Sequence, residues 1–139
     1  MKVLICEDEE VMLTALEFRL RRIGYQVIKA ADGRIALDQF LAHTPDIVIA
    51  NLQMPFISGL ELLKHIRVEL RNVTPVIIFT ALEEEDAILE SMRHGANDFI
   101  AKPFRPMELI LRIRTALQQV MPSPQWEEVI ATPKREIIS

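Results

Sequence analysis

Five short apolar runs, rich in Val and Ile, recur along the chain, and a segment of helical periodicity separates each from the next. The runs are typical of β-strands and occupy residues 2–6, 25–29, 46–50, 75–79 and 97–101. The intervening segments place apolar side chains three or four positions apart, as in Leu13, Leu16 and Leu20, which predicts amphipathic helices. The predicted order is therefore strand then helix, repeated five times.

The five predicted strands differ in composition. The first, third and fourth are almost continuously apolar, whereas the second and fifth include polar residues. Strands that helices cover on both faces have the first composition, and strands at the edge of a sheet have the second. The pattern predicts an α/β fold with a doubly wound parallel sheet between two helical layers. In such open sheets, ligands bind beyond the carboxyl ends of the strands.

Polar side chains follow the carboxyl ends of four of these strands. Glu7 and Asp8 follow the first strand, Asn51 the third, Thr80 the fourth and Lys102 the fifth. Neighbouring carboxylates repel each other unless a cation lies between them, and hard oxygen ligands suit Mg²⁺. A metal, a lysine and a hydroxyl around one central acceptor can bind and neutralise a transferring phosphoryl group.

Four segments, in order along about residues 1–120, resemble the motifs of the receiver domain of two-component response regulators. They are VLICEDEE, IVIANLQMPFISGLEL, FTALEE and GANDFIAKPF. The resemblance implies a flavodoxin-like (βα)5 fold with strand order 2-1-3-4-5. It also implies Mg²⁺-dependent phosphoryl transfer from a histidine kinase or phosphotransfer protein, and a conformational switch that an output partner or domain reads.

The resemblance assigns a metal site to four residues. Glu7 and Asp8 match the acidic pair of the family, with Asp8 as the direct Mg²⁺ ligand and Glu7 acting more often through water. Asn51 falls at the phospho-acceptor position, and Gln53 would offer its backbone carbonyl to the metal.

Three further residues match positions that bind the phosphoryl group or respond to it. Thr80 matches the hydroxyl residue that hydrogen-bonds a phosphoryl oxygen, and Phe99 matches the aromatic whose rotamer follows Thr80. Lys102 matches the cation that pairs with the phosphoryl group. By analogy, the bond between Lys102 and Pro103 is expected to be cis.

Asn51 departs from the family, because the phospho-acceptor is an aspartate. A carboxamide has no anionic oxygen and its nitrogen lone pair is delocalised, so the nucleophile is missing. We therefore expect no self-phosphorylation, and weaker Mg²⁺ binding because one anionic ligand is lost. Either the asparagine is native, which makes the domain a pseudo-receiver, or it replaces a native aspartate, which would make the natural protein an active phospho-acceptor.

The fifth strand and last helix correspond to the usual partner surface of the family. Asp98, Glu108 and Arg112 fall where regulators with winged-helix outputs have interface charges, which suggests a homodimer through the fourth helix, fifth strand and fifth helix. A solvated charged face is the alternative.

Composition narrows the remaining function classes. With 20 Asp and Glu against 16 Lys and Arg, the chain is not expected to bind nucleic acid directly. No signal-peptide region or 18-residue apolar span occurs, so we expect a cytoplasmic protein without membrane contact. Cys6 is interpreted as a packed thiol, and His43, His65 and His94 lack metal-ligand spacing. A dinucleotide-binding enzyme is disfavoured because no G-x-G-x-x-G follows the first strand.

The helical pattern ends near residue 120. Pro122 and Pro124 stop it, and the following residues include Trp126, the only tryptophan. We expect a receiver domain over residues 1–120 and a C-terminal tail over 121–139, which is either a shortened linker or a segment that packs on the domain or a partner.

Overall fold

The computed structural model describes residues 1–81 and 83–120, in which five strands alternate with helices. The strands are β1 (Lys2–Cys6), β2 (Gln26–Ala30), β3 (Ile47–Asn51), β4 (Val76–Thr80) and β5 (Asp98–Ala101). The helices are α1 (Glu10–Arg22), α2 (Gly33–His43), α3 (Gly59–Lys64), α4 (Glu85–Arg93) and α5 (Pro106–Val120); α3 continues directly into a π-helix, η1 (His65–Glu69). The predicted alternation is confirmed. The predicted tail, residues 121–139, lies outside the described residues.

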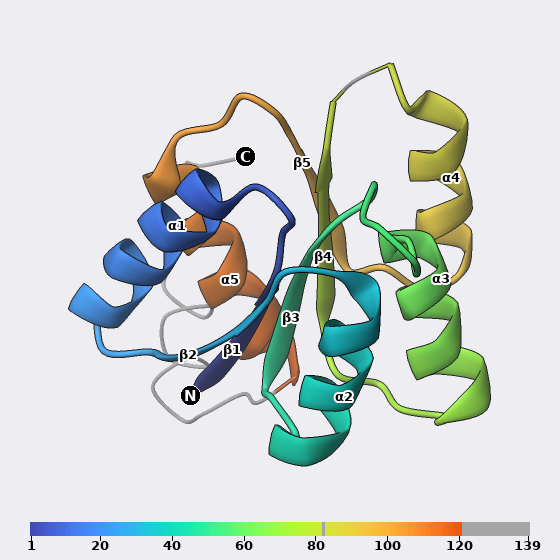
Figure 1. Cartoon of the computed structure of the whole chain (residues 1–139), viewed down its shortest axis with the longest axis horizontal. Helices are drawn as coiled ribbons and strands as arrows, with labels where there is room; N and C mark the ends of the chain where they lie inside the picture. The colour runs from blue at the N-terminus through green and yellow to red at the C-terminus, as the bar shows by residue number, and fades with distance from the viewer. Residues whose placement is uncertain (82, 121–139) are drawn as a thin grey trace, which may run out of the picture.

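All five strands are parallel, and they lie in the order β2-β1-β3-β4-β5. Figure 1 shows α1 and α5 on one side of the sheet and α2, α3 and α4 on the other. The central strands β3 and β4 are buried along their whole length, whereas β2 and β5 are partly exposed, as the sequence predicted for edge strands. The flavodoxin-like (βα)5 prediction is therefore correct.

Alternating side chains of each strand fill two separate cores. Val3 and Ile5 pack with α1 and α5, whereas Leu4 and Cys6 pack with α2 and α3. This alternation follows from the two-residue repeat of a strand, and it explains why the central strands are apolar at every position. Cys6 is fully buried, as expected, and its burial raises the pKa of the thiol.

The strand bounds differ slightly from the predicted ones. β2, β3 and β4 each lie one residue later than predicted, and β5 begins one residue later. Pro75 has no backbone N–H to give to the sheet, although its carbonyl accepts a bond from Val48 N–H (2.9 Å). A run of apolar residues locates a strand, but it does not show which residues form the first and last hydrogen-bonded pairs of that strand.

The π-helix η1 was not predicted from the sequence. Leu70 N–H donates to the carbonyl of His65, five residues earlier, at 3.0 Å. Within η1, the guanidinium of Arg67 donates to the carbonyls of Asn72, Thr74 and Gly95 at 2.8–3.2 Å. Arg67 therefore ties η1 to the loop before β4 and to the end of α4.

The loop between β3 and α3 turns tightly beside the site edge of the sheet. A Cβ on Gly59 would overlap the backbone of Asn51, so only glycine permits this approach. Phe56 has a φ of 70°, which is rare for a bulky residue, yet 66% of its surface is exposed. Its ring lies under the guanidinium of Arg34 in α2, 3.5 Å from the ring centroid. The loop thus holds an exposed aromatic ring in an unfavourable backbone conformation.

No helix in the described part of the chain is both long enough and apolar enough to cross a membrane.

We expect Phe56→Gly to be more stable than Phe56→Ala by about 1 kcal/mol, because both variants lose the ring but only glycine adopts a positive φ without a steric penalty. Urea unfolding of the two variants measures the difference directly. Alanine is normally the better residue, so equal stability, or the alanine variant being more stable, would show that the backbone at residue 56 is not strained.

Candidate functional site

The register of the sheet brings the predicted site residues to one edge. Ala50 of β3 pairs with Cys6 of β1 and Ile78 of β4, so Glu7, Asn51 and Thr80 all lie at or just beyond the same end of their strands. In β5, Ala101 pairs with Thr80, which places Lys102 at the same edge. These residues are widely separated in sequence, and the parallel order of the strands gathers them.

Glu7 lies at the centre of this edge and is only 1% exposed. Its two carboxylate oxygens accept hydrogen bonds from Asn51 Nδ2 at 3.3 and 3.1 Å. One oxygen also forms a salt bridge with Lys102 Nζ at 3.2 Å, and the other accepts the backbone N–H of Glu9 at 3.0 Å. Both oxygens of this buried anion are therefore occupied by donors.

The environment of Glu7 favours its ionised form. Burial opposes ionisation, but the hydrogen bonds from Glu9, Asp8 and Asn51, together with the charge of Lys102, hold the pKa of Glu7 below its ordinary value. Asp8 is mostly exposed. Its pKa is raised by a hydrogen bond with the Glu7 carboxylate, by partial loss of solvent and by the like charge of Glu7. The acidic pair thus consists of one buried anion and one accessible carboxylate.

The side chain of Asn51 joins two elements of the site. Its amide nitrogen donates to Glu7, and its oxygen Oδ1 accepts the backbone N–H of Gln53 at 3.2 Å. Residue 51 is 7% exposed, so the amide is held between these partners. The lone pair of an amide nitrogen is delocalised into the carbonyl, so it is not available for attack on phosphorus.

Thr80 and Lys102 are adjacent across β4 and β5. Thr80 is buried, and its backbone carbonyl accepts the Lys102 N–H at 2.7 Å. The Lys102 ammonium also lies 5.0 Å from the centroid of the Phe79 ring. The bond between Lys102 and Pro103 is cis, as expected from the resemblance. Lys102 therefore reaches back from β5 toward the acidic pair.

Phe99 lies on β5, two residues before Ala101, so its side chain is on the same face of the sheet as Thr80. It is half-buried and packs against the core on the α2, α3 and α4 side of the sheet. The structure thus places both predicted switch residues on one face, at neighbouring strands.

One contact at the site was not predicted. The side-chain amide of Gln53 donates to the carboxylate of Glu84, the residue just before α4. The resemblance implied a role only for the backbone carbonyl of Gln53, and no sequence signal connects residue 84 with residue 53.

The oxygen donors at this edge fit a divalent cation, although with less charge than three carboxylates would supply. Glu7 and Asp8 contribute two carboxyl groups and Asn51 a neutral amide oxygen. Among residues 1–81 and 83–120, no cluster of three or more His, Cys, Asp or Glu side chains could hold a metal ion.

Among models of protein families, that of the response regulator receiver domain matches residues 3–114 of this chain. The chain is 40% identical over 119 residues to a probable transcriptional regulator ycf27 of Porphyridium aerugineum, covering 86% of this chain and 49% of that protein. It is 34% identical over 118 residues to the alkaline phosphatase synthesis transcriptional regulatory protein PhoP of Bacillus subtilis, covering 85% and 49%. The chain thus spans about half the length of these curated relatives.

Among solved structures, the receiver domain of the Francisella response regulator 1452 superposes with a TM-score of 0.80. The two chains are 29% identical, and the match covers 86% of this chain and 98% of the other. Receiver domains bind Mg²⁺ at their phosphorylation site, which agrees with the oxygen donors at the carboxyl edge of this sheet. The fold, the matched family model and these relatives together establish that the chain belongs to the response regulator receiver domains of two-component signalling.

Proposed function

We propose that this receiver domain does not accept a phosphoryl group at residue 51 and acts in signalling through contacts with other proteins. Response regulators interact with histidine kinases and output domains, so partners of both kinds are the expected ones. The observation on which the proposal depends is the amide of Asn51, whose nitrogen donates to both oxygens of Glu7. A carboxylate here would present an anionic oxygen instead.

The proposed roles of the surrounding residues follow from their chemistry. Glu7, Asp8, the Asn51 side-chain oxygen and the backbone carbonyl of Gln53 would hold Mg²⁺, with weaker affinity than if residue 51 were an aspartate. When bound, the cation neutralises charge on phosphoryl oxygens. Replacing an anionic ligand by a neutral one weakens Mg²⁺ binding in a solvated site by about a few kcal/mol at most.

Three residues would serve the phosphoryl group itself. The Lys102 ammonium would pair with it, and the Thr80 hydroxyl would hydrogen-bond one of its oxygens, with Phe99 responding to Thr80. In support, the Lys102 ammonium lies 3.2 Å from the buried Glu7 carboxylate, and the Lys102 backbone N–H donates a hydrogen bond to the Thr80 carbonyl.

A second candidate is an active phospho-acceptor in which Asn51 stands where the natural protein has aspartate. It is favoured by the intact remainder of the pocket: Glu7, Asp8, Thr80 and Lys102 are all present at the strand ends. Drift without function would be expected to replace some of these residues too.

We also propose that the unit is cytoplasmic, comprises a receiver domain over residues 1–120, and does not contact DNA itself. The two curated relatives are named as transcriptional regulators, but this chain spans only about half of them and has an excess of acidic residues. DNA binding in a longer form would then belong to another domain.

Self-association through α4, β5 and α5 is part of the proposal. Arg112 donates to both carboxylate oxygens of Asp98 at 2.8 and 2.9 Å, and reaches Glu108 at 3.4 Å, so these charges are ordered within one chain. Beside them, Met107 and Leu111 expose more than half of their surface. An ordered ion pair next to exposed apolar side chains suits a weak interface.

Acetyl phosphate with Mg²⁺ tests phosphoryl acceptance. We expect no mass increase for the chain with Asn51, and an increase of about 80 Da for Asn51→Asp, in which the carboxylate oxygen attacks phosphorus and acetate leaves. Intact mass spectrometry measures both, and the Asn51→Ala variant shows whether any increase comes from phosphorylation of another residue. An increase in the Asn51 chain that Asn51→Ala abolishes would refute the proposal.

Calorimetric titration tests the metal prediction. Asn51→Asp is expected to bind Mg²⁺ at least about tenfold more tightly than the Asn51 chain, because it restores an anionic ligand. Asn51→Ala should bind no more tightly than the Asn51 chain. Equal affinities for asparagine and aspartate would mean that residue 51 is not a ligand.

Analytical ultracentrifugation tests the dimer. The chain is expected to form a reversible dimer at high micromolar concentration, and Leu111→Lys is expected to remain monomeric because the charge would be buried at the interface. Leu41→Lys, at an equally exposed leucine of α2, is the matched control and should still dimerise. A monomer at every concentration would exclude this interface.

A further inference from the structure

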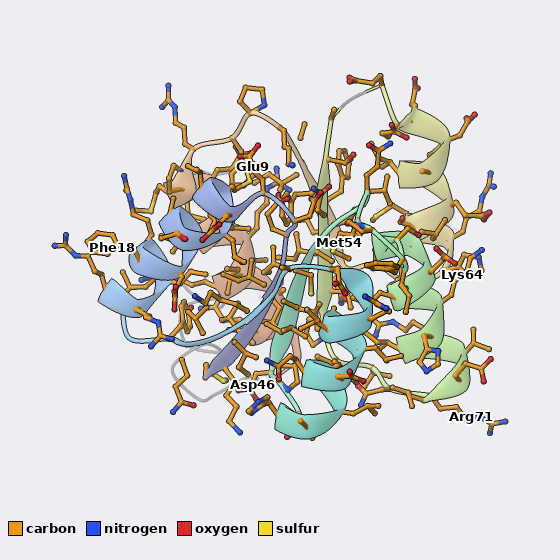
Figure 2. The ribbon with its side chains drawn as sticks, in the orientation of Figure 1. Glu9, Phe18, Asp46, Met54, Lys64 and Arg71 are labelled. Atoms are coloured by element: carbon orange, nitrogen blue, oxygen red, sulfur yellow. The ribbon has the colours of Figure 1, made fainter. Side chains whose placement is uncertain are left out.

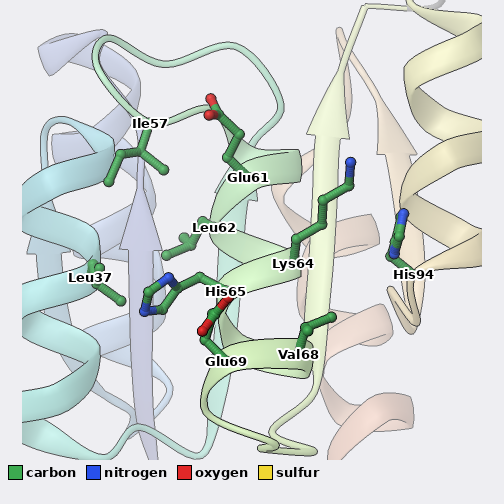
Figure 3. A pocket seen from close by; sticks show the side chains of 9 residues that line it. All are labelled: Leu37, Ile57, Glu61, Leu62, Lys64, His65, Val68, Glu69 and His94. Carbon is green, nitrogen blue, oxygen red and sulfur yellow. The ribbon is translucent and has the colours of Figure 1, made fainter.

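A groove runs beside α3 on the face of the molecule opposite to α1 and α5. It has a volume of about 490 Å³, and its residues come from α2, α3, η1, the β3–α3 loop and the end of α4. Figure 3 shows Leu37 of α2, Ile57 of the loop and Leu62 of α3 on the α2 side of the groove, and Lys64 and His94 on the α4 side. The part between α2 and α3, called the channel below, is lined by Leu37, Ile57 and Leu62, and the ring of His65 also lies in it.

Carboxylates lie along the α3 side of this apolar channel. Glu61, His65 and Glu69 follow one another at intervals of four residues, so they form a row along one side of α3 and η1. Within the described part of the chain, neither Glu61 nor Glu69 forms a salt bridge, although one oxygen of Glu61 accepts the backbone N–H of Ser58 at 3.0 Å in a capping box. The two acids lie about two turns apart along α3 and η1.

Two unusual backbone features border the same channel. The π-helix η1 contributes His65 and Glu69 to it, and π-helical segments frequently occur at functional positions. The strained Phe56 directly precedes Ile57, and Arg34, which covers its ring, lies one turn before Leu37. An exposed aromatic residue in an unfavourable backbone conformation is tolerated most often at functional sites.

The groove lies outside the acidic pocket and outside the α4–β5–α5 face. None of Glu7, Asp8, Asn51, Thr80 or Lys102 lines it. Any partner that binds there is therefore distinct from the phosphoryl donor and from a second copy at the dimer face.

We propose that the α2–α3 groove binds an amphipathic helix of a partner protein, with apolar side chains in the channel and two basic residues opposite Glu61 and Glu69. An apolar groove of this kind takes a helix through side chains three or four positions apart. Basic residues seven or eight positions apart on that helix match the spacing of the two carboxylates. Phe56 directly precedes the groove residue Ile57, and aromatic and arginine residues such as Phe56 and Arg34 are the types that contribute most to binding.

The test uses the full 139-residue chain and a synthetic helical peptide. The peptide has leucines on one face and two lysines eight positions apart at the edge of that face, and a second peptide has glutamates in place of those lysines. We expect the lysine peptide to bind and to shift the backbone amide signals of α2, of α3 with η1, and of the β3–α3 loop in NMR spectra. The glutamate peptide is expected not to bind.

Exposed residues provide variants that should not affect folding. Val68 of η1 lines the groove and is 61% exposed, and Val11 of α1, on the opposite side of the sheet, is 78% exposed. Val68→Lys and Glu69→Lys are expected to weaken binding of the lysine peptide at least about tenfold, through lost apolar contact and charge repulsion. Val11→Lys and Glu10→Lys, both at exposed positions of α1, are the matched controls, with an expected change below about twofold.

Several outcomes would overturn the proposal. These are the absence of binding by either peptide, equal binding of both peptides, signal changes confined to other faces, and equal effects of the groove and control variants. Concentration-dependent shifts of the groove signals that persist in the Leu111→Lys variant would assign the groove to a second copy. A change in Trp126 fluorescence on Val68→Lys that the lysine peptide reproduces would assign it to the chain's own residues 121–139.

Discussion

The buried carboxylate of Glu7 determines how the polar edge of this domain is arranged. An unpaired buried carboxylate would be strongly unfavourable, and Glu7 avoids this through Lys102, the Asn51 amide and the Glu9 backbone N–H. With an amide at residue 51, the site has one buried anion beside one cation, and no second buried carboxylate competes for Lys102. The amide of Asn51 therefore gives Glu7 an additional donor.

The fold separates this site from the other surfaces. Strand order and register gather the polar residues at one edge of the sheet, whereas the α2–α3 groove and the α4–β5–α5 face are made of helix surfaces. Figure 2 shows Met54 near the carboxyl edge, and Lys64 and Arg71 along the side formed by α3 and η1. The residues that would bind a phosphoryl group are therefore separate from the two surfaces proposed for protein contacts. This separation agrees with our proposal that the domain acts through contacts.

Most of the fold was predictable from the sequence, because apolar strands and amphipathic helices have different repeats and these repeats are local. The clustering of Glu7, Asn51, Thr80 and Lys102 was also predictable, since the ends of parallel strands meet at one edge. Which acid of the pair is buried was not predictable, because this depends on packing around Glu7 that no local pattern encodes. The Gln53–Glu84 contact was missed because the two residues are distant in sequence. The π-helix was missed because the apolar periodicity of this segment is also that of an α-helix and does not reveal the five-residue hydrogen bond from Leu70 to His65.

Beryllofluoride binding tests the central claim most directly, because this phosphoryl mimic requires a carboxylate oxygen to complete its coordination while the lysine, hydroxyl and metal site hold its fluorines. Fluorine NMR in the presence of Mg²⁺ should detect no bound species with the Asn51 chain and a bound species with Asn51→Asp. That result would mean that the pocket lacks only its nucleophile. Bound signals of equal intensity in both proteins, or no bound signal in either, would contradict the account.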